Sequence, residues 1–195
     1  MKISKNKKNF LIGEIGSAII FFVGVIFILI PNIYGLEGTS EIEVNDLFIS
    51  LSLIIACVYF CFYCSIGNNP TNESVYLSIV AALSGILNLL LTRYLSSSLA
   101  LAISVLEFTV LSSLVKLITI DYYHDRKDAF YYIEALLTVL FFVAGVLISV
   151  SLFNDPLVQT IELGFFLVMI GGIESINVAT KALLKAPRFL GKIKF

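Results

Sequence analysis

The sequence has no tryptophan, only one histidine, and few charged residues, which make up 14% of its 195 positions. Soluble domains carry about 25% charged residues, so the low value argues against a soluble globular domain. The net charge of −1 provides no basic surface for phosphates, and we expect no nucleic-acid partner.

Sequence motifs of common enzymes are also missing. There is no His-Glu-x-x-His, no Gly-x-Ser-x-Gly and no phosphate-binding glycine loop. One histidine and isolated acidic residues leave little for hydrolysis inside a membrane. We therefore expect a protein that is not an enzyme and that needs no cofactor.

The three cysteines offer no metal site. Cys57, Cys61 and Cys64 follow a spacing of four and then three residues, which places them on one face of a helix. Thiolate metal sites usually have four ligands with loop-like spacing. We expect no bound metal and interpret these cysteines as small packing residues.

Long apolar runs are the main feature of the chain, which is 58% hydrophobic with a mean hydropathy of +0.97. A membrane-spanning helix needs about 20 apolar residues, and backbone groups in lipid must form hydrogen bonds within their own segment. The predicted fold class is an all-α membrane protein with six transmembrane helices. The predicted spans are about 10–31, 46–66, 75–95, 98–119, 129–152 and 157–180.

Basic residues indicate the orientation of these spans. Twelve of the 13 lysines and arginines precede the first span, flank the connection between the fourth and fifth, or follow the sixth. Only Arg93 falls on the other side. Because cytoplasmic segments are rich in Lys and Arg, we expect a cell (inner or plasma) membrane protein with both termini in the cytoplasm.

The expected partner is the lipid bilayer, and a homo-oligomer is left open. The basic tail at 181–195 alternates basic and apolar residues. Two interpretations of the tail stay open, because it can contact anionic lipid at the inner leaflet or only fix the topology.

A pattern of small residues recurs in the first, third and fifth spans. The glycines are 61 and then 60 residues apart, and each follows a hydroxyl residue by seven positions. The glycines are Gly24, Gly85 and Gly145, and the hydroxyl residues are Ser17, Ser78 and Thr138. Small residues seven apart share a helix face and let helices approach closely. The pattern predicts three tandem parallel helical hairpins at about 10–66, 75–120 and 129–180 in one membrane domain, 1–195, with the tail 181–195.

The same stretches carry a resemblance to a known family. They are Gly-Val-Ile-Phe-Ile-Leu-Ile-Pro at 24–31, the segment from Gly145 to Pro156, and Gly-Gly-Ile-Glu-Ser-Ile at 171–176. With them the chain resembles the HdeD family, also called the short-repeat domain of unknown function 308. The middle hairpin departs from that pattern, because its turn at 93–98 has no proline. The resemblance implies a small six-helix inner-membrane protein linked to acid resistance, without catalytic residues.

Glu107 is the candidate for an intramembrane polar site, together with Asn88. Glu107 lies near the middle of the fourth span, where a carboxyl group is costly and marks a functional site by default. Asn88, Ser104 and Thr109 are its expected polar neighbours. Two interpretations stay open: a proton-responsive or substrate-binding carboxyl group, or a glutamic acid that hydrogen-bonds between helices as part of the packing.

Other glutamates lie close to the ends of the predicted spans. Glu14, Glu134, Glu162 and Glu174 are interpreted as interfacial charges that reach headgroups or water. Glu174 and Lys116 lie at matching depth, where they can pair. If several of these carboxyl groups instead face the interior together with Glu107, they would form a ladder of carboxylates of the kind that moves protons.

Two functions are compatible with this sequence. One is a non-enzymatic membrane protein of HdeD type that acts in acid or envelope stress. The alternative is a small-molecule or proton-coupled carrier or binding subunit that uses Glu107. A central cavity lined by Glu107 would favour the carrier, and a fully packed core would argue against it.

Overall fold

The computed structural model describes residues 5–39, 44–66, 72–125, 130–152 and 156–185, and the regular structure in these ranges is entirely α-helical. The six helices are α1 (Lys5–Thr39), α2 (Val44–Ile66), α3 (Glu73–Leu91), α4 (Ser97–Asp125), α5 (Phe130–Ser151) and α6 (Pro156–Lys185). Each is long and apolar enough to cross a membrane. The predicted all-α membrane protein with six transmembrane helices is confirmed.

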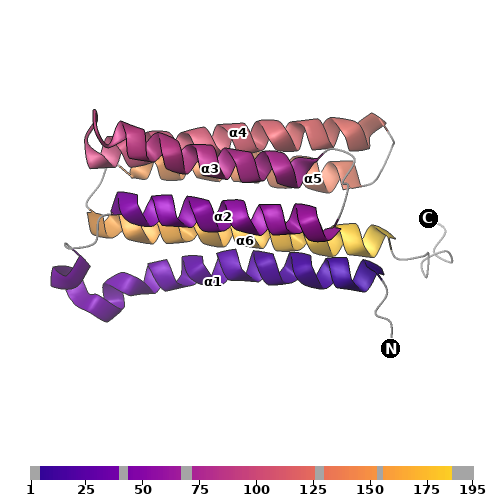
Figure 1. Ribbon diagram of the computed structural model, residues 1–195, viewed down its shortest axis with the longest axis horizontal. Helices are drawn as coiled ribbons and strands as arrows, with labels where there is room; N and C mark the ends of the chain where they lie inside the picture. The colour runs from indigo at the N-terminus through magenta and orange to yellow at the C-terminus, as the bar shows by residue number, and fades with distance from the viewer. Residues whose placement is uncertain (1–4, 40–43, 67–71, 126–129, 153–155, 186–195) are drawn as a thin grey trace.

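The first helix continues further than its predicted end at about residue 31. It passes through Pro31 and ends at Thr39. A proline inside a helix removes one backbone hydrogen bond and bends the helix without necessarily ending it. Figure 1 shows α1 bent towards its C-terminal end.

The helices run alternately up and down, so α1 begins and α6 ends at the same end of the bundle (Figure 1). We call this end the tail end. Each helix packs against its neighbours in the chain, and α1 packs along α6, which closes the six helices into a ring. The second helix also contacts α4 and α6 across the interior.

The most extensive helix contacts join α1 to α6, α2 to α3, and α4 to α5. These pairs lie between the predicted hairpins rather than within them. The arrangement as three tandem hairpins, with their predicted bounds, therefore stays a prediction.

The three glycines of the sequence pattern lie at these close contacts. A Cβ atom on Gly24 would lie 2.7 Å from Gly164 O and Val168 N of α6, and one on Gly85 would lie 3.0 Å from Cβ of Ser52 in α2. A Cβ on Gly145 would overlap Thr109 of α4. Each glycine thus faces the partner helix of its close pair, as expected of small residues that let helices approach.

The hydroxyl residues of the pattern are less uniform. Ser17 Oγ donates to Gly13 O in its own helix over 2.9 Å, whereas Ser78 Oγ donates to Ala56 O in α2 over 2.8 Å. The Thr138 side chain is buried. Of these three side chains, only that of Ser78 forms a hydrogen bond to another helix within the described residues.

Three helices, α2, α4 and α6, present buried residues at matching positions. A buried position in α2 has a buried counterpart 57 positions later in α4, and that position has another counterpart 58 positions later in α6. The matched sets are Val44, Leu101 and Gln159; Phe48, Val105 and Leu163; Leu51, Phe108 and Phe166; Ser52, Thr109 and Leu167; Ile55, Ser112 and Ile170; Tyr59, Lys116 and Glu174; and Phe62, Thr119 and Asn177.

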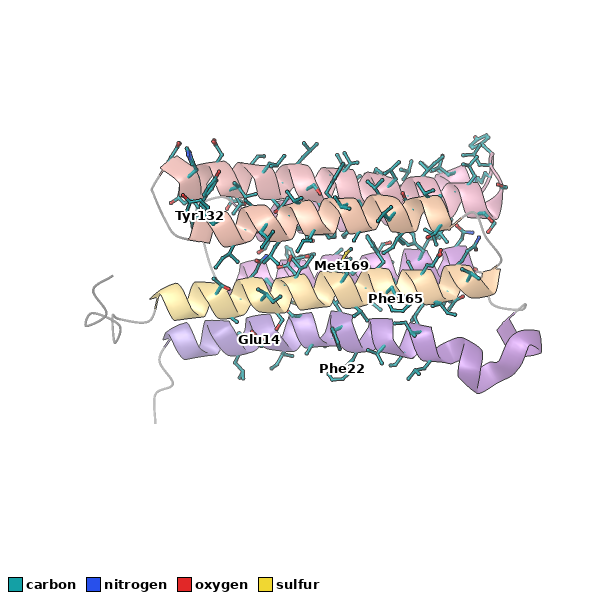
Figure 2. The ribbon with its side chains drawn as sticks, turned by 180° about the vertical axis from the view of Figure 1, so that it is seen from behind. Glu14, Phe22, Tyr132, Phe165 and Met169 are labelled. Carbon is teal, nitrogen blue, oxygen red and sulfur yellow. The ribbon has the colours of Figure 1, made fainter. Side chains whose placement is uncertain are left out.

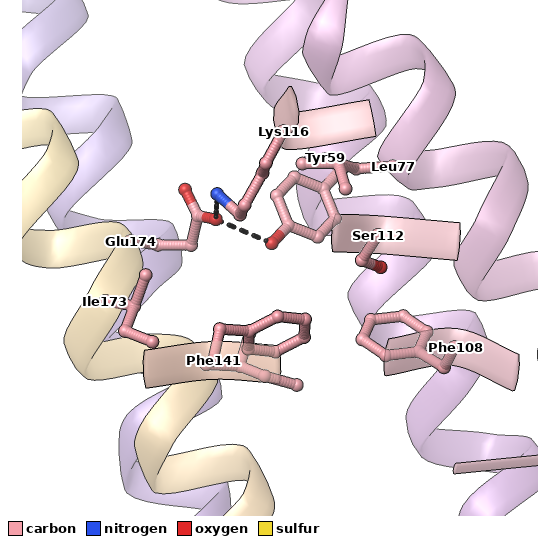
Figure 3. A pocket seen from close by; sticks show the side chains of 9 residues that line it. Tyr59, Leu77, Phe108, Ser112, Lys116, Phe141, Ile173 and Glu174 are labelled. Carbon is pink, nitrogen blue, oxygen red and sulfur yellow. Dashed lines mark hydrogen bonds and ion pairs between the residues drawn. The ribbon is translucent and has the colours of Figure 1, made fainter. Parts of the chain in front are cut away.

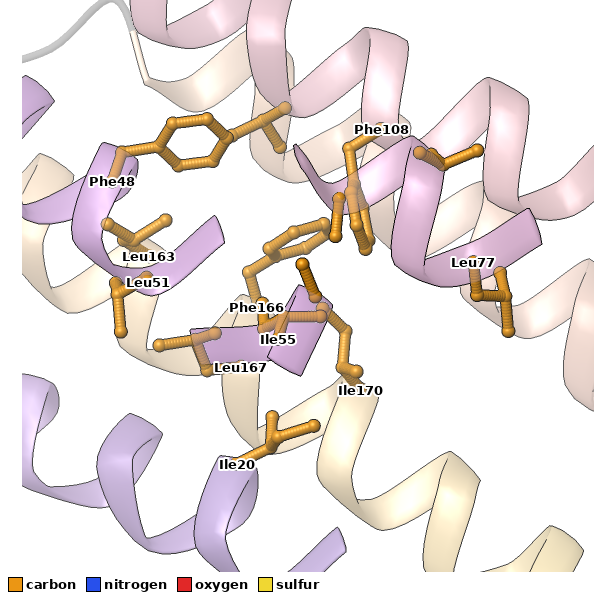
Figure 4. Close-up of a cluster of buried hydrophobic side chains, with 14 of the residues drawn as sticks. Ile20, Phe48, Leu51, Ile55, Leu77, Phe108, Leu163, Phe166, Leu167 and Ile170 are labelled. Carbon is orange, nitrogen blue, oxygen red and sulfur yellow. The ribbon is translucent and has the colours of Figure 1, made fainter. Parts of the chain in front are cut away.

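Two of these sets are wholly apolar and belong to the hydrophobic core: Phe48, Val105 and Leu163, and Leu51, Phe108 and Phe166. Figure 4 shows Phe108 and Phe166 next to each other, and Phe48 lines the same small cavity as both. The Phe108 and Phe166 rings are 5.7 Å apart between centroids, and Phe141 of α5 contacts both. Large apolar side chains such as Phe22 point outwards (Figure 2), where a bilayer would surround them. The one set that contains a lysine and a glutamate is Tyr59, Lys116 and Glu174.

Candidate functional site

Lys116 lies in the interior of the bundle with three carboxyl groups around it. It comes from α4 and is only 2% exposed. Its Nζ atom is 2.9 Å from Oε1 of Glu174 in α6, and 3.6 Å from Oε1 of both Glu73 in α3 and Glu134 in α5. Four helices therefore meet at one ammonium group.

Neutral side chains complete this group. Tyr59 Oη of α2 donates to the same Glu174 oxygen over 3.0 Å, as Figure 3 shows. Asn177 Nδ2 of α6 donates to Glu134 Oε1 over 3.4 Å. We call Tyr59, Glu73, Lys116, Glu134 and Glu174 the Lys116 cluster.

The cluster lies towards the tail end of the bundle. Glu73 is the first residue of α3, and Glu134 follows the start of α5 by four positions. Lys116 precedes the end of α4 by nine residues, or about 13 Å at 1.5 Å per residue. Lys116 and Glu174 both fall within the apolar windows of their helices, so the charges lie inside the membrane-spanning part.

A buried charge is strongly unfavourable unless it is paired, which explains why Lys116 is surrounded by acids. The cluster nevertheless has more acids than the lysine requires. One ammonium and three carboxylates, all ionised, would carry a net charge of −2. Protons or other cations must balance this surplus for the cluster to be neutral.

The predicted pairing of Glu174 with Lys116 is confirmed by the 2.9 Å contact. The interpretation of Glu134 and Glu174 as interfacial charges was wrong, because these residues are 0% and 7% exposed. Their carboxyl groups turn inwards because the Lys116 ammonium lies there. Glu14 and Glu162 are partly buried, and Glu14 accepts a hydrogen bond from Ser175 over 2.7 Å.

Sequence reasoning missed Glu73, which it placed just outside the third predicted span. The spacing of 60 residues between the third and fifth spans, from Gly85 to Gly145, pairs Glu134 with Ser74 and misses Glu73 by one residue. The small-residue pattern therefore gave no direct signal for Glu73.

The structure does not join Glu107 and Asn88 as one site. Glu107 is half-buried on α4 and accepts a hydrogen bond from Ser84 of α3. Asn88 is buried and donates to Asn45 Oδ1 of α2 over 2.9 Å.

The other expected neighbours of Glu107 have different partners as well. Ser104 Oγ donates to Ala100 O, and Thr109 Oγ1 donates to Val105 O, each over 2.8 Å. Hydroxyl groups in helices commonly bond to the carbonyl four residues earlier, and in the described part of the bundle neither of these two side chains bonds to Glu107.

Two cavities in the bundle have volumes of about 10 Å³ each, roughly the space that one water molecule needs. One adjoins the Lys116 cluster, and the other is lined mainly by apolar residues such as Phe48 and Leu163. Glu107 lines neither of them. Neither of these two cavities has room for an organic molecule of vitamin size.

The interpretation of the cysteines as packing residues was wrong. Cys57, Cys61 and Cys64 are all exposed on α2. The inner face of that helix is occupied by Ile55, Tyr59 and Phe62, so the face with the cysteines turns outwards.

No family model, curated protein or solved structure matches this chain.

Proposed function

We propose that this protein is a non-enzymatic membrane protein that takes up protons at the Lys116 cluster and acts in acid or envelope stress, as the resemblance to the HdeD family implies. The observation that carries the proposal is the set of three glutamates around one buried lysine. Intramembrane carboxyl groups that face a bundle interior are the usual elements of proton relays.

Proton uptake at this position would change how the helices pack. The carboxyl groups come from α3, α5 and α6, and all of them approach the ammonium of α4. Electrostatic interactions are weakly screened in a buried site, so each proton alters the attraction between helices. A local change in charge would then be converted into a change in helix arrangement.

The proposed orientation places the tail end, and with it the Lys116 cluster, near the cytoplasm. It also brings the basic tail at 181–195 to the anionic inner leaflet; residues 186–195 of that tail lie outside the described ranges. Arg93 follows the end of α3, and His124 lies in the last turn of α4, at the other end of the bundle. Both residues are exposed, so labelling at these two positions can report the orientation.

In a variant with the native cysteines replaced by alanine, we expect Arg93→Cys to react with a membrane-impermeant maleimide in intact cells. His124→Cys should react only after permeabilisation. The reverse labelling pattern would overturn the proposed orientation.

Acid survival tests the proposed role. A strain that lacks this protein is complemented with wild type, Glu174→Gln or Glu107→Gln, and survival is counted after acid shock. We expect protection by wild type and loss of protection with Glu174→Gln, because the glutamine cannot take up a proton. Glu107→Gln is the matched control, since Glu107 lies outside the cluster, and it should protect. Equal protection by Glu174→Gln at equal membrane levels, or no effect of the deletion, would contradict the proposal.

A proton-coupled carrier for a small ion is the second candidate, and it is favoured by a second polar network at the opposite end. Asn88 donates to Asn45, which bonds Ser97, and Gln159 Nε2 donates to Ser98 Oγ over 2.8 Å. Apolar residues such as Phe108 and Phe166 lie between this network and the Lys116 cluster. Purified protein in liposomes with an internal pH dye separates the candidates, because only a carrier would produce a proton flux that Glu174→Gln abolishes.

A further inference from the structure

The cavity beside the Lys116 cluster has both a polar and an aromatic side. Tyr59, Lys116 and Glu174 line one side, and Phe108 and Phe141 line the other (Figure 3). Ser112 also lines this cavity. The volume of about 10 Å³ matches the space for a single water molecule, which needs two to four polar partners in order to stay in a protein interior.

Ser112 is the residue of this cavity whose hydrogen bonding is incomplete. It is 2% exposed, and its Oγ atom has no hydrogen-bond partner among the described residues. Two other buried hydroxyl residues of the same helix, Ser104 and Thr109, bond to a backbone carbonyl instead. A buried hydroxyl group without a partner is unfavourable, so the position of Ser112 beside a polar cavity indicates an occupant that bonds to it.

Other groups around the cavity have unused hydrogen-bonding capacity. Ser112 lies four residues before Lys116, so both side chains are on one face of α4. The Lys116 ammonium has three N–H donors, yet only Glu174, at 2.9 Å, is within hydrogen-bond distance of it in the described part of the chain. The distances of 3.6 Å to Glu73 and Glu134 exceed that range.

We propose that one water molecule binds in this cavity and links Ser112 to Lys116 and to the hydrogen-bonded pair of Tyr59 and Glu174. The water accepts a hydrogen bond from Lys116 and donates to Ser112 Oγ and to an oxygen of Tyr59 or Glu174. Ser112 is then a member of the site, although its Oγ atom forms no direct hydrogen bond with the charged groups. The water and Ser112 therefore extend the hydrogen-bonded chain from the Lys116 cluster towards Phe108 and Phe141.

This inference rests on the proposed function only where it treats the cluster as a proton-binding site. A bound water between a carboxylate and a hydroxyl group would lengthen the path along which a proton can move. The aromatic rings beyond it offer no further hydrogen-bond acceptor of comparable strength, so the chain ends there.

Infrared spectroscopy of the full protein in lipid films tests the water site, with water itself as the probe. The O–H stretching region is compared in films hydrated with H₂¹⁶O and with H₂¹⁸O. We expect wild type to show an isotope-sensitive band of a strongly hydrogen-bonded internal water. Ser112→Ala should lose this band because one partner of the water is gone.

Ser113→Ala is the matched control. Ser113 is also buried and its Oγ atom also has no hydrogen-bond partner in the described part of the bundle, but it does not line the cavity. The variant should keep the band, and circular dichroism should show that both variants remain helical. The absence of the band in wild type, or its persistence in Ser112→Ala, would overturn the proposal.

The infrared result is independent of the acid-survival result. A band that depends on Ser112 in a protein whose Glu174→Gln variant still protects cells would support the water site and contradict the proposed function. Protection that depends on Glu174, in a protein without such a band, would support the proposed function and contradict the water site.

Discussion

Replacement of Lys116 by methionine is expected to lower the free energy of unfolding by about 3–5 kcal/mol. Methionine has a similar length, so the loss comes from the missing charge rather than from a cavity. The substitution leaves Glu73, Glu134 and Glu174 together in the interior without a cation. Unfolding by a denaturing detergent in mixed micelles, followed by circular dichroism, measures the effect.

Arg93→Met is the matched control for this measurement. It also removes one positive charge, but Arg93 is exposed, and surface substitutions usually change stability by less than about 0.5 kcal/mol. The double variant Lys116→Met with Glu174→Gln should be more stable than Lys116→Met alone, because one surplus carboxyl group is removed. A stability of Lys116→Met close to that of Arg93→Met would show that the lysine contributes little to the packing.

Gly24→Ala is expected to destabilise the contact between α1 and α6 by about 1–3 kcal/mol. The new Cβ atom would lie 2.7 Å from Gly164 O and Val168 N. These are backbone atoms, which cannot move without the whole of α6, so the two helices would have to separate. The same detergent titration measures the loss.

Gly172→Ala provides the comparison within the same bundle. A Cβ atom on Gly172 would have no atom within 4 Å, and alanine stabilises a helix by about 0.5–1 kcal/mol relative to glycine. This variant should be as stable as wild type or more so. Equal effects of the two substitutions would mean that the close approach of α1 to α6 does not limit stability.

The six helices were predictable because a hydropathy pattern is local to each segment. Burial of a side chain is not local, and Glu107 and Lys116 illustrate the difference. They are nine residues apart in α4, and at about 100° per residue they lie on opposite faces of the helix. The sequence therefore showed that Glu107 and Lys116 cannot both face the interior. It could not show which one does, because α4 is apolar on both faces.

The Lys116 cluster was predictable only in part. Depth in the membrane follows from position along each span, so the pairing of Lys116 with Glu174 could be foreseen. The approach of Glu73 and Glu134 depends on α3 and α5 flanking α4, and helix order around a ring is not encoded in hydropathy. The outward position of the cysteines was missed for the same reason.

The contact between α1 and α6 joins the first and last helices of the chain and is among the most extensive in the ring. Packing of α1 against α6, rather than a connecting loop, therefore closes the ring of helices. A circular permutant should fold when a linker joins the end of α6 to the start of α1, which lie at the same end of the bundle, and the chain is opened instead between α2 and α3. The packing of the bundle would then not depend on which helix begins the chain.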